Sequence, residues 1–246
     1  MKKITNLMLG LLNLKLVKTN HITSNSNNLG YISATETIKN ANKEGLTVCD
    51  YVEKMWNQVG ETDKIIGSME KYGAFEYTNP AICEIGAGTG RYMEKVIEKC
   101  NPKRYESYET ANDWSAWLQK EYPIISHPTD GFSLKFTSDN SIDIAHAHGV
   151  FVYLNFLDNI RYFNEMKRVI KPNGIIIFDC FTEECMTAEL LNNWLQSQHN
   201  FPVLLPNDYI ISYFENFNFK LVGNFFNTYG QGKSKYFVFK RTDLDF

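Results

Sequence analysis

The stretch AICEIGAGTGRYMEKVIEK, residues 81–99, decides the fold of this chain. Gly86, Gly88 and Gly90 occupy three of five consecutive positions, between an apolar run and an amphipathic run. Three glycines so close together cost conformational entropy on folding, so the structure must need backbone without Cβ atoms at this point. The simplest explanation is a ligand that lies against the main chain.

The flanking residues indicate what kind of ligand this is. Residues 81–85 predict a strand and residues 91–99 a helix, and α/β sheets bind ligands at such a junction. A dinucleotide fingerprint G-x-G-x-x-G would need glycine where Arg91 stands, whereas the observed pattern is G-x-G-x-G. Glu109 ends the next apolar run, where a carboxylate can accept both hydroxyls of a ribose. The ligand is therefore expected to carry a ribose with a free 2′-hydroxyl.

Downstream of the glycines, short apolar runs alternate with helical stretches, which indicates βαβ units and a parallel sheet. A helix is expected over residues 155–170 and is stopped by Pro172 and Gly174. The apolar runs are KRYESYE (103–109), IDIAHA (142–147) and GIIIFDCF (174–181), and the closing runs are FKLVGNFF (219–226) and KYFVFKR (235–241). The two closing runs suggest an antiparallel pair at one edge. We predict a Rossmann-like, doubly wound α/β fold, mostly parallel, with an antiparallel C-terminal edge strand.

Helical signals precede the first strand. Ser33 with Glu36 forms a capping-box pattern and Thr47 with Asp50 a weaker one, so two or three helices are expected there. A helix near residues 207–217 is also expected, after a less regular region. We divide the chain into an N-terminal helical segment, residues 1–78, and a main domain, residues 79–246.

At the N-terminus, Lys2 and Lys3 precede an apolar run as in a signal peptide. That run is interrupted by Asn13, Lys15 and Lys18, and no small-residue cleavage site follows. A short amphipathic helix is favoured instead, with one face formed by Ile4, Leu7, Met8 and Leu11.

The composition restricts the class of protein. A net charge of -3 and a pI near 6.0 argue against nucleic-acid binding, and no segment has the ~20 apolar residues of a membrane span. Five cysteines without a C-x-x-C pair or metal-ligand spacing indicate reduced thiols and no metal site. We expect a cytoplasmic enzyme with a small-molecule substrate. Whether it forms a homodimer stays open.

Over residues 80–180 the sequence resembles the class I S-adenosylmethionine-dependent methyltransferases. EIGAGTGRY looks like their first motif, YESYE like their second strand with its ribose-binding acid, and MKRVIKPNG like the helix and turn before their fifth strand. The segment from Pro128 to Leu154 is similar to the part from their adenine-binding Asp through the fourth strand. Asn173 departs from the pattern, since a second glycine is common there.

The resemblance implies S-adenosylmethionine as cofactor and a role for each matched residue. The glycines would lie against its methionine part, Glu84 near its amino group and Glu109 on its ribose. Asp130 and the backbone of Gly131 would meet the adenine edge. The other expected cofactor contacts are Ala87, Tyr92, Thr110 and His146.

The resemblance weakens at the end of the fourth strand. Many relatives place a Glu-His pair where this chain has Val152 and Tyr153, and the chain instead offers His146 and His148. Strand alternation puts both imidazoles on one face, at the end of the sheet that faces the ligand. A histidine beside the transferred methyl can deprotonate a hydroxyl acceptor. His148 is the preferred base, while His146 is more readily a core or cofactor-packing residue.

These features favour O-methylation of a small polar acceptor. The chain is similar in character to bacterial methyltransferases that act on sugars or phosphorylated precursors of surface polysaccharides. Helices over residues 34–58, with Tyr51, are expected to form a lid that excludes water. Two alternatives stay open: a nicotinamide-dependent oxidoreductase, disfavoured by Arg91, and a protein that binds S-adenosylmethionine without catalysis.

Overall fold

A computed structural model describes residues 31–197 and 203–242 of the chain. The chain divides into two compact units, residues 1–31 and 32–246, and the description below concerns the second unit. The helix expected around Ile4 to Leu11 lies outside the described residues.

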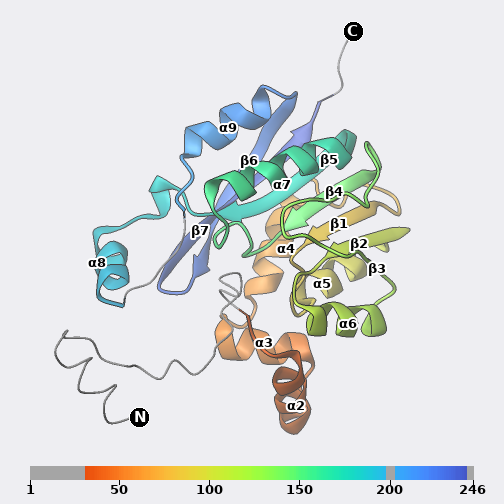
Figure 1. Cartoon of the computed structure of the whole chain (residues 1–246), viewed down its shortest axis with the longest axis vertical. Coiled ribbons are helices and arrows are strands. Elements are labelled where there is room, and N and C mark those ends of the chain that lie inside the picture. Colours follow the sequence, from red (N-terminus) through yellow and green to blue (C-terminus); the bar gives the residue numbers. More distant parts are fainter. Residues whose placement is uncertain (1–30, 198–202, 243–246) are drawn as a thin grey trace, which may run out of the picture. The chain divides into compact units, whose positions relative to one another are not determined.

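A seven-stranded sheet forms the centre of the unit (Figure 1). Its strands lie in the order β3-β2-β1-β4-β5-β7-β6, and β7 runs antiparallel to both of its neighbours. The strands are β1 (Ala81–Ile85), β2 (Arg104–Tyr108), β3 (Ile125–Ser126), β4 (Ile142–Ala147), β5 (Ile170–Cys180), β6 (Phe219–Tyr229) and β7 (Gly232–Arg241). This topology confirms the predicted fold class, including the antiparallel edge.

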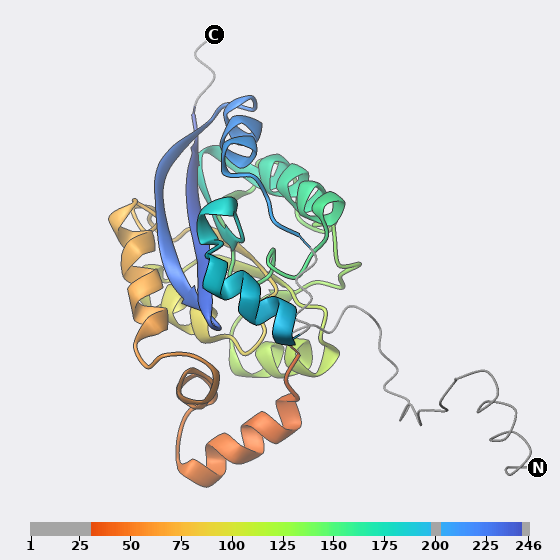
Figure 2. The ribbon, with the colours of Figure 1, turned by 90° about the vertical axis from the view of Figure 1, so that its left-hand side faces the viewer.

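Helices cover both faces of the sheet (Figure 2). The helices are α2 (Ala34–Glu44), α3 (Val48–Trp56), α4 (Glu61–Lys71), α5 (Arg91–Cys100), α6 (Asn112–Glu121), α7 (Phe156–Val169), α8 (Ala188–Ser197) and α9 (Asn207–Glu215). On one face, Met69 of α4 and Val96 of α5 pack on Ile144 and Ile177. On the other face, α7 and α9 contribute Phe163 and Phe214 to a core that includes Phe178 and Phe239. β1 lies between β2 and β4 and is buried along its whole length.

From residue 31 onward, three helices precede the first strand, in line with the two or three predicted, and two begin at the expected caps. The Ser33 hydroxyl accepts a hydrogen bond from the Glu36 N–H at 3.4 Å, and the Thr47 hydroxyl accepts one from the Asp50 N–H at 3.0 Å. Each cap satisfies one backbone donor that the first turn of a helix leaves free. These local signals were therefore sufficient to locate α2 and α3, whereas α4, which follows Gly60, begins without a side-chain cap.

Two local predictions differ from the structure. The strand expected at residue 174 begins at Ile170, because Ile170 pairs with Ile142 while Ile175 pairs with Ile144. The residues between form an irregularity inside the strand, with Asn173 at a φ of 63°. The region after residue 181, expected to be irregular, contains the 3-10 turn η1 (Glu183–Cys185) and α8.

The strand directions bring functional residues to one edge of the sheet. The carboxyl ends of β1, β2, β4 and β5 meet there, together with the end of β6 and the start of β7. Each of the five cysteines lies in the described part of the chain and is free. No helix among residues 31–197 and 203–242 is both long and apolar enough to span a membrane.

Candidate functional site

The three glycines of the loop after β1 serve different purposes. All three have positive φ angles, of 67°, 53° and 77° for Gly86, Gly88 and Gly90. A Cβ atom on Gly86 would lie 2.5 Å from Val150 Cγ2, and one on Gly90 would lie 2.7 Å from Leu118 Cδ2. A Cβ atom on Gly88 would meet no described atom closer than the Gly86 carbonyl oxygen, at 4.0 Å. Close packing thus explains two of the glycines, while Gly88 borders open space where a ligand can approach the backbone.

Glu109, directly after β2, is tied to this loop. One carboxylate oxygen accepts the Gly88 N–H at 2.6 Å, and the other accepts the Ala111 N–H at 2.7 Å. Burial raises the pKa of the Glu109 carboxyl, while these backbone donors oppose that shift. The Thr110 N–H is a third backbone donor to this carboxylate, so at least one of its four lone pairs is left for a further donor.

The predicted adenine-side residues lie in a more exposed loop. The Asp130 carboxylate accepts hydrogen bonds from the N–H groups of Phe132 and Ser133, at 3.1 and 2.8 Å, and from the Ser133 hydroxyl at 2.7 Å. It therefore fixes its own turn, and these bonds lower its pKa against the opposing effect of burial. Gly131, with a φ of 85°, has open space where a Cβ would project, among the described residues. Thr110 is exposed.

Glu84 and the two histidines belong to one buried chain of hydrogen bonds. The Tyr105 hydroxyl lies 2.7 Å from Glu84 Oε2 and 3.0 Å from His146 Nε2. His146 Nδ1 lies 3.1 Å from His148 Nε2, and His148 Nδ1 lies 3.1 Å from the Tyr236 hydroxyl. These hydrogen bonds run from β2 and β1 through β4 to β7. All four ring nitrogens of the two histidines take part in them.

Burial controls the charge of these groups. It raises the pKa of the Glu84 carboxyl to about 8 and lowers the pKa of the His146 imidazole to about 3. Burial also lowers the pKa of His148 well below its usual range, and the neighbouring His146 and Arg91 add to that effect. Both imidazoles are therefore neutral at physiological pH, so the 3.8 Å approach of His146 to Glu84 is not an ion pair.

A small polar cavity of about 40 Å³ lies at the His148 and Tyr236 end of this chain of hydrogen bonds. Its lining combines hydrogen-bonding side chains from α5, from the end of β6 and from the start of β7 with residues after β4 and near the end of β5. The lining residues are Asn57, Arg91, Tyr92, His148, Gly149, Asp179, Asn227, Thr228, Tyr229 and Tyr236. Burial raises the pKa of Asp179 to about 6, although its carboxylate accepts the Gly149 N–H at 2.7 Å. A cavity of this volume is too small for a whole sugar.

Arg91 and Tyr92 form one wall of the small cavity. The Tyr92 ring stacks on the His148 imidazole with 3.9 Å between ring centroids, and the Arg91 guanidinium carbon lies 4.7 Å from the Tyr92 ring centroid. Arg91 Nη2 donates to the Tyr92 hydroxyl at 2.9 Å. Arg91 Nη1 is buried and has no hydrogen-bond partner among the described residues.

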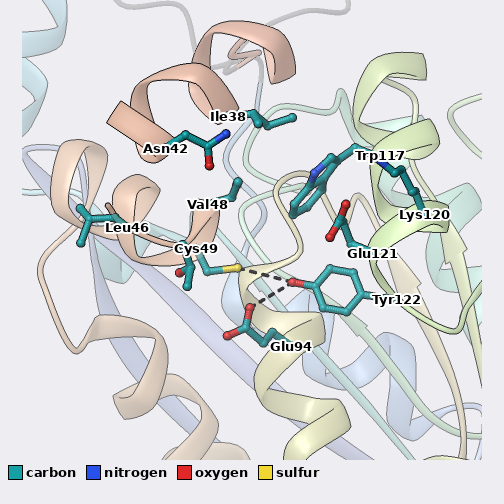
Figure 3. A pocket seen from close by; sticks show the side chains of 11 residues that line it. Ile38, Asn42, Leu46, Val48, Cys49, Glu94, Trp117, Lys120, Glu121 and Tyr122 are labelled. Atoms are coloured by element: carbon teal, nitrogen blue, oxygen red, sulfur yellow. Dashed lines mark hydrogen bonds between the residues drawn. The ribbon is translucent and has the colours of Figure 1, made fainter. Parts of the chain in front are cut away.

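A larger cavity of about 560 Å³ lies between α2, α3, α5 and α6 (Figure 3). Cys49, Tyr122 and Glu94 point toward one another in it, with the Tyr122 hydroxyl 3.8 Å from Cys49 Sγ and 3.0 Å from Glu94 Oε2. Burial raises the pKa of the Cys49 thiol, which also reaches the Thr89 carbonyl oxygen at 3.8 Å. None of the residues predicted to bind cofactor lines this cavity.

The strand order, the glycine loop after β1 and the acidic residue after β2 define a Rossmann-like α/β protein that binds a ribose-containing cofactor. Residues 83–178 match a family model described as a methyltransferase domain. Through this domain the chain is similar to the class I S-adenosylmethionine-dependent methyltransferases, and it is an enzyme with S-adenosylmethionine as its cofactor. No curated protein sequence matches the chain at a significant level.

Solved structures with this fold are distant in sequence. A putative sarcosine dimethylglycine methyltransferase from Galdieria sulphuraria is 11% identical, with a TM-score of 0.59 over 75% of this chain and 86% of its own. Magnesium protoporphyrin IX methyltransferase from Synechocystis, with bound SAH, is 8% identical, with a TM-score of 0.58 over 87% and 90%. An S-adenosylmethionine-dependent methyltransferase from Mesorhizobium loti is 12% identical, with a TM-score of 0.56 over 71% and 96%. At sequence identities this low, the similarity shows a shared fold alone.

Several pocket residues were not predicted from the sequence. In the sequence Arg91 is notable only as a mismatch to the dinucleotide fingerprint, whereas in the structure it lines the small cavity. Asp179 stands near the carboxyl end of a predicted strand, the same signal that singled out His148. Tyr105 and Tyr236 carry no local signal, because only strand pairing brings them to the histidines.

Proposed function

We propose that this enzyme transfers the methyl group to an oxygen of a small polar acceptor. The proposed acceptor is a sugar or a phosphorylated precursor of a bacterial surface polysaccharide. The observation that carries the proposal is the small cavity, in which Arg91, Asp179, Asn227 and the tyrosines offer hydrogen bonds to a polar group. An apolar acceptor would leave the buried Arg91 Nη1, which has no hydrogen-bond partner among the described residues, unsatisfied at a cost in free energy.

The proposed cofactor contacts follow from the loop geometry. The backbone around Gly88 would take the methionine part, because Gly88 borders open space. Glu109 would bind the ribose hydroxyls with its remaining lone pairs, and Asp130 with Gly131 would meet the adenine. When bound, S-adenosylmethionine supplies a methyl group already activated on a sulfonium. The protein then has to orient the acceptor, which can supply ~7 to 11 kcal/mol of such a barrier.

Arg91 supports an acceptor that carries negative charge. Its buried Nη1 has no hydrogen-bond partner among the described residues, and it lies beside a stacked pair of rings at the cavity wall. A guanidinium binds phosphate or carboxylate oxygens well, because its donors form a planar fork. A phosphorylated sugar would place its phosphate on Arg91 while a hydroxyl reaches Tyr236.

A hydroxyl acceptor must lose its proton as the methyl group arrives. His148 is the proposed base. Its Nδ1 faces Tyr236 and its Nε2 faces His146, so the acceptor proton would reach the imidazole by way of the Tyr236 hydroxyl. His146 would support His148 through the bond between their rings.

Helices α2 and α3 are proposed to act as the lid. Cys49 of α3 contacts the glycine loop at the Thr89 carbonyl, and the Ala34 N–H at the start of α2 donates to Asp113 Oδ2 at 3.0 Å. The Cys49 contact supports a lid in which α3 moves when the glycine loop binds its ligand.

The function can be tested with a panel of acceptors. The enzyme is incubated with S-adenosylmethionine and free sugars, sugar phosphates, nucleotide sugars, amines or carboxylic acids, and formation of S-adenosylhomocysteine is measured. The proposal expects turnover with a sugar or sugar phosphate and a new O-methyl resonance in the NMR spectrum of the product. A methyl group found on nitrogen, or turnover only with amines, would refute O-methylation. Arg91→Gln should raise KM for a phosphorylated acceptor more than for its dephosphorylated form.

A further inference from the structure

Five polar side chains form an unbroken hydrogen-bonded chain from the small cavity to the buried carboxyl of Glu84. We propose that Tyr236, His148, His146, Tyr105 and Glu84 form a proton relay that carries the acceptor proton away from the cavity. Glu84, rather than His148, is then the final proton acceptor. The proposal rests on the proposed O-methylation, because a hydroxyl acceptor must lose its proton as the methyl group arrives.

The geometry of the relay is set by the sheet. Glu84 on β1 and His146 on β4 are register partners, and Tyr105 reaches them from β2. His148 follows β4 and reaches Tyr236 on β7, across the intervening β5. The successive donor to acceptor distances are 3.1, 3.1, 3.0 and 2.7 Å, all within hydrogen-bonding range. Four of the five residues are at most 5% exposed, and His148 is 8% exposed at the cavity wall.

The protonation state of Glu84 sets the direction of every hydrogen bond between Tyr236 and Glu84. Each tyrosine hydroxyl has one proton, and each neutral imidazole carries one on Nδ1 or Nε2. When Glu84 is ionised, Tyr105 donates to it, both histidines carry their proton on Nε2, and Tyr236 donates to His148. When Glu84 is protonated, every bond reverses and both histidines carry the proton on Nδ1. The two arrangements differ by one proton at Glu84.

The proton transfer balances when Glu84 is ionised at the start. The acceptor proton moves to the Tyr236 oxygen, and the Tyr236 proton moves to His148 Nδ1. The His148 Nε2 proton moves to His146 Nδ1, the His146 Nε2 proton to Tyr105, and the Tyr105 proton to Glu84. The acceptor oxygen forms its bond to the methyl carbon, and the electron pair of the broken carbon–sulfur bond stays on sulfur. No imidazole keeps a second proton, which suits rings whose charged form is disfavoured by burial.

The surroundings favour Glu84 as the final acceptor. Burial raises its pKa, and the charge of Glu109 adds to that effect. His148 instead faces Arg91 and Tyr92 of α5, Asp179 near the end of β5 and Tyr236 of β7, and the Arg91 guanidinium opposes its protonation. After the product leaves, the reverse sequence returns the proton to water in the cavity and restores the chain without any ring rotation.

The relay can be tested on the cofactor-free protein by ¹⁵N NMR of its histidine side chains between pH 5 and 10. Nitrogen shifts report which ring nitrogen carries the proton. The proposal expects His146 and His148 to change together from the Nδ1–H to the Nε2–H form as the pH rises, with neither ring becoming charged. A single tautomer at either histidine across this range, in a protein that stays folded, would overturn the relay.

Two buried tyrosines on β2 provide the matched variants. Tyr105→Phe removes one oxygen from the chain and should abolish the pH-dependent change at both histidines. Tyr108→Phe removes an equally buried hydroxyl that bonds to Thr137 at 2.9 Å, and it should leave the change intact. Persistence of the change in Tyr105→Phe would refute the link to Glu84. Because no acceptor is present, this result is independent of the acceptor panel that tests O-methylation.

Discussion

The carboxylate of Glu109 accepts the backbone N–H of Gly88 at 2.6 Å, and this bond joins the end of β2 to the glycine loop after β1. Two residues that the sequence assigned to different parts of one cofactor are thus in direct contact. Glu109 has a structural role in holding the loop, besides its proposed role on the ribose. Its removal should therefore affect the whole cofactor site.

Glu109→Ala is expected to weaken S-adenosylhomocysteine binding by about 1–3 kcal/mol, because charge-assisted hydrogen bonds are lost. Isothermal titration calorimetry measures the change. Asp143→Ala is the matched control, since Asp143 accepts the Ala81 N–H at 2.7 Å at the opposite end of β1. Equal affinity of Glu109→Ala and the folded control would remove Glu109 from the cofactor site.

Gly88→Val is expected to abolish S-adenosylhomocysteine binding, because the side chain would fill the space beside the loop. Its φ of 53° adds backbone strain, so a control must carry similar strain elsewhere. Gly60→Val is this control, because Gly60 has a φ of 84° and a Cβ atom there would meet open space among the described residues. Thermal shift with and without ligand separates the two effects. Normal binding by Gly88→Val would show that the ligand lies elsewhere.

The proposed lid predicts a local change in hydrogen exchange. Amide exchange in α2 and α3 should slow when S-adenosylhomocysteine binds, because the helices close over the loop that Cys49 already contacts. Helix α9, which packs in the core on the other face of the sheet, should show no comparable change. Protection confined to the glycine loop, with none in residues 34–58, would count against a lid.

Glu84 makes stability depend on pH in a defined direction. Its pKa rises from an ordinary value of 4.5 to about 8 on folding, so the folded state keeps a proton that the unfolded state loses. The free energy of unfolding therefore falls as pH rises between these values, by up to about 1.4 kcal/mol per unit. This contribution is fully present below pH 4.5 and is lost once the pH passes 8.

Glu84→Gln should remove that contribution. Urea denaturation of the cofactor-free protein at pH 5, 6, 7 and 8 should give a shallower loss of stability in the variant than in the wild type. Glu98→Gln, which changes a side chain that is 60% exposed, should keep the wild-type slope. Parallel curves for wild type and Glu84→Gln would contradict the raised pKa.

His148→Ala should lower turnover about 10²- to 10⁴-fold with a hydroxyl acceptor, because the path for the acceptor proton is broken. Affinity for S-adenosylhomocysteine, measured by calorimetry, should stay close to that of the wild type. An acceptor oxygen that is already ionised needs no base, so the same variant would then keep most of its turnover. Full turnover with a hydroxyl acceptor would remove His148 from the mechanism.

Sequence patterns alone predicted the fold class, the antiparallel edge and the N-terminal helices. These features depend on local signals: the burial of β1 on both sides gives a run that is apolar except for Glu84, and the caps at Ser33 and Thr47 act within one helical turn. The glycine loop was recognised for the same reason, because positive φ angles at close spacing require glycine.

Only the tertiary structure decided which glycine borders open space and how the histidines are connected. Val150 and Leu118 are distant in sequence from Gly86 and Gly90, so their close approach could not be predicted from the loop itself. Likewise, Tyr236 meets His148 because β7 lies antiparallel beside β5. Burial by those same strands keeps both imidazoles neutral and raises the pKa of Glu84, and desolvation is a property of packing that no sequence motif records.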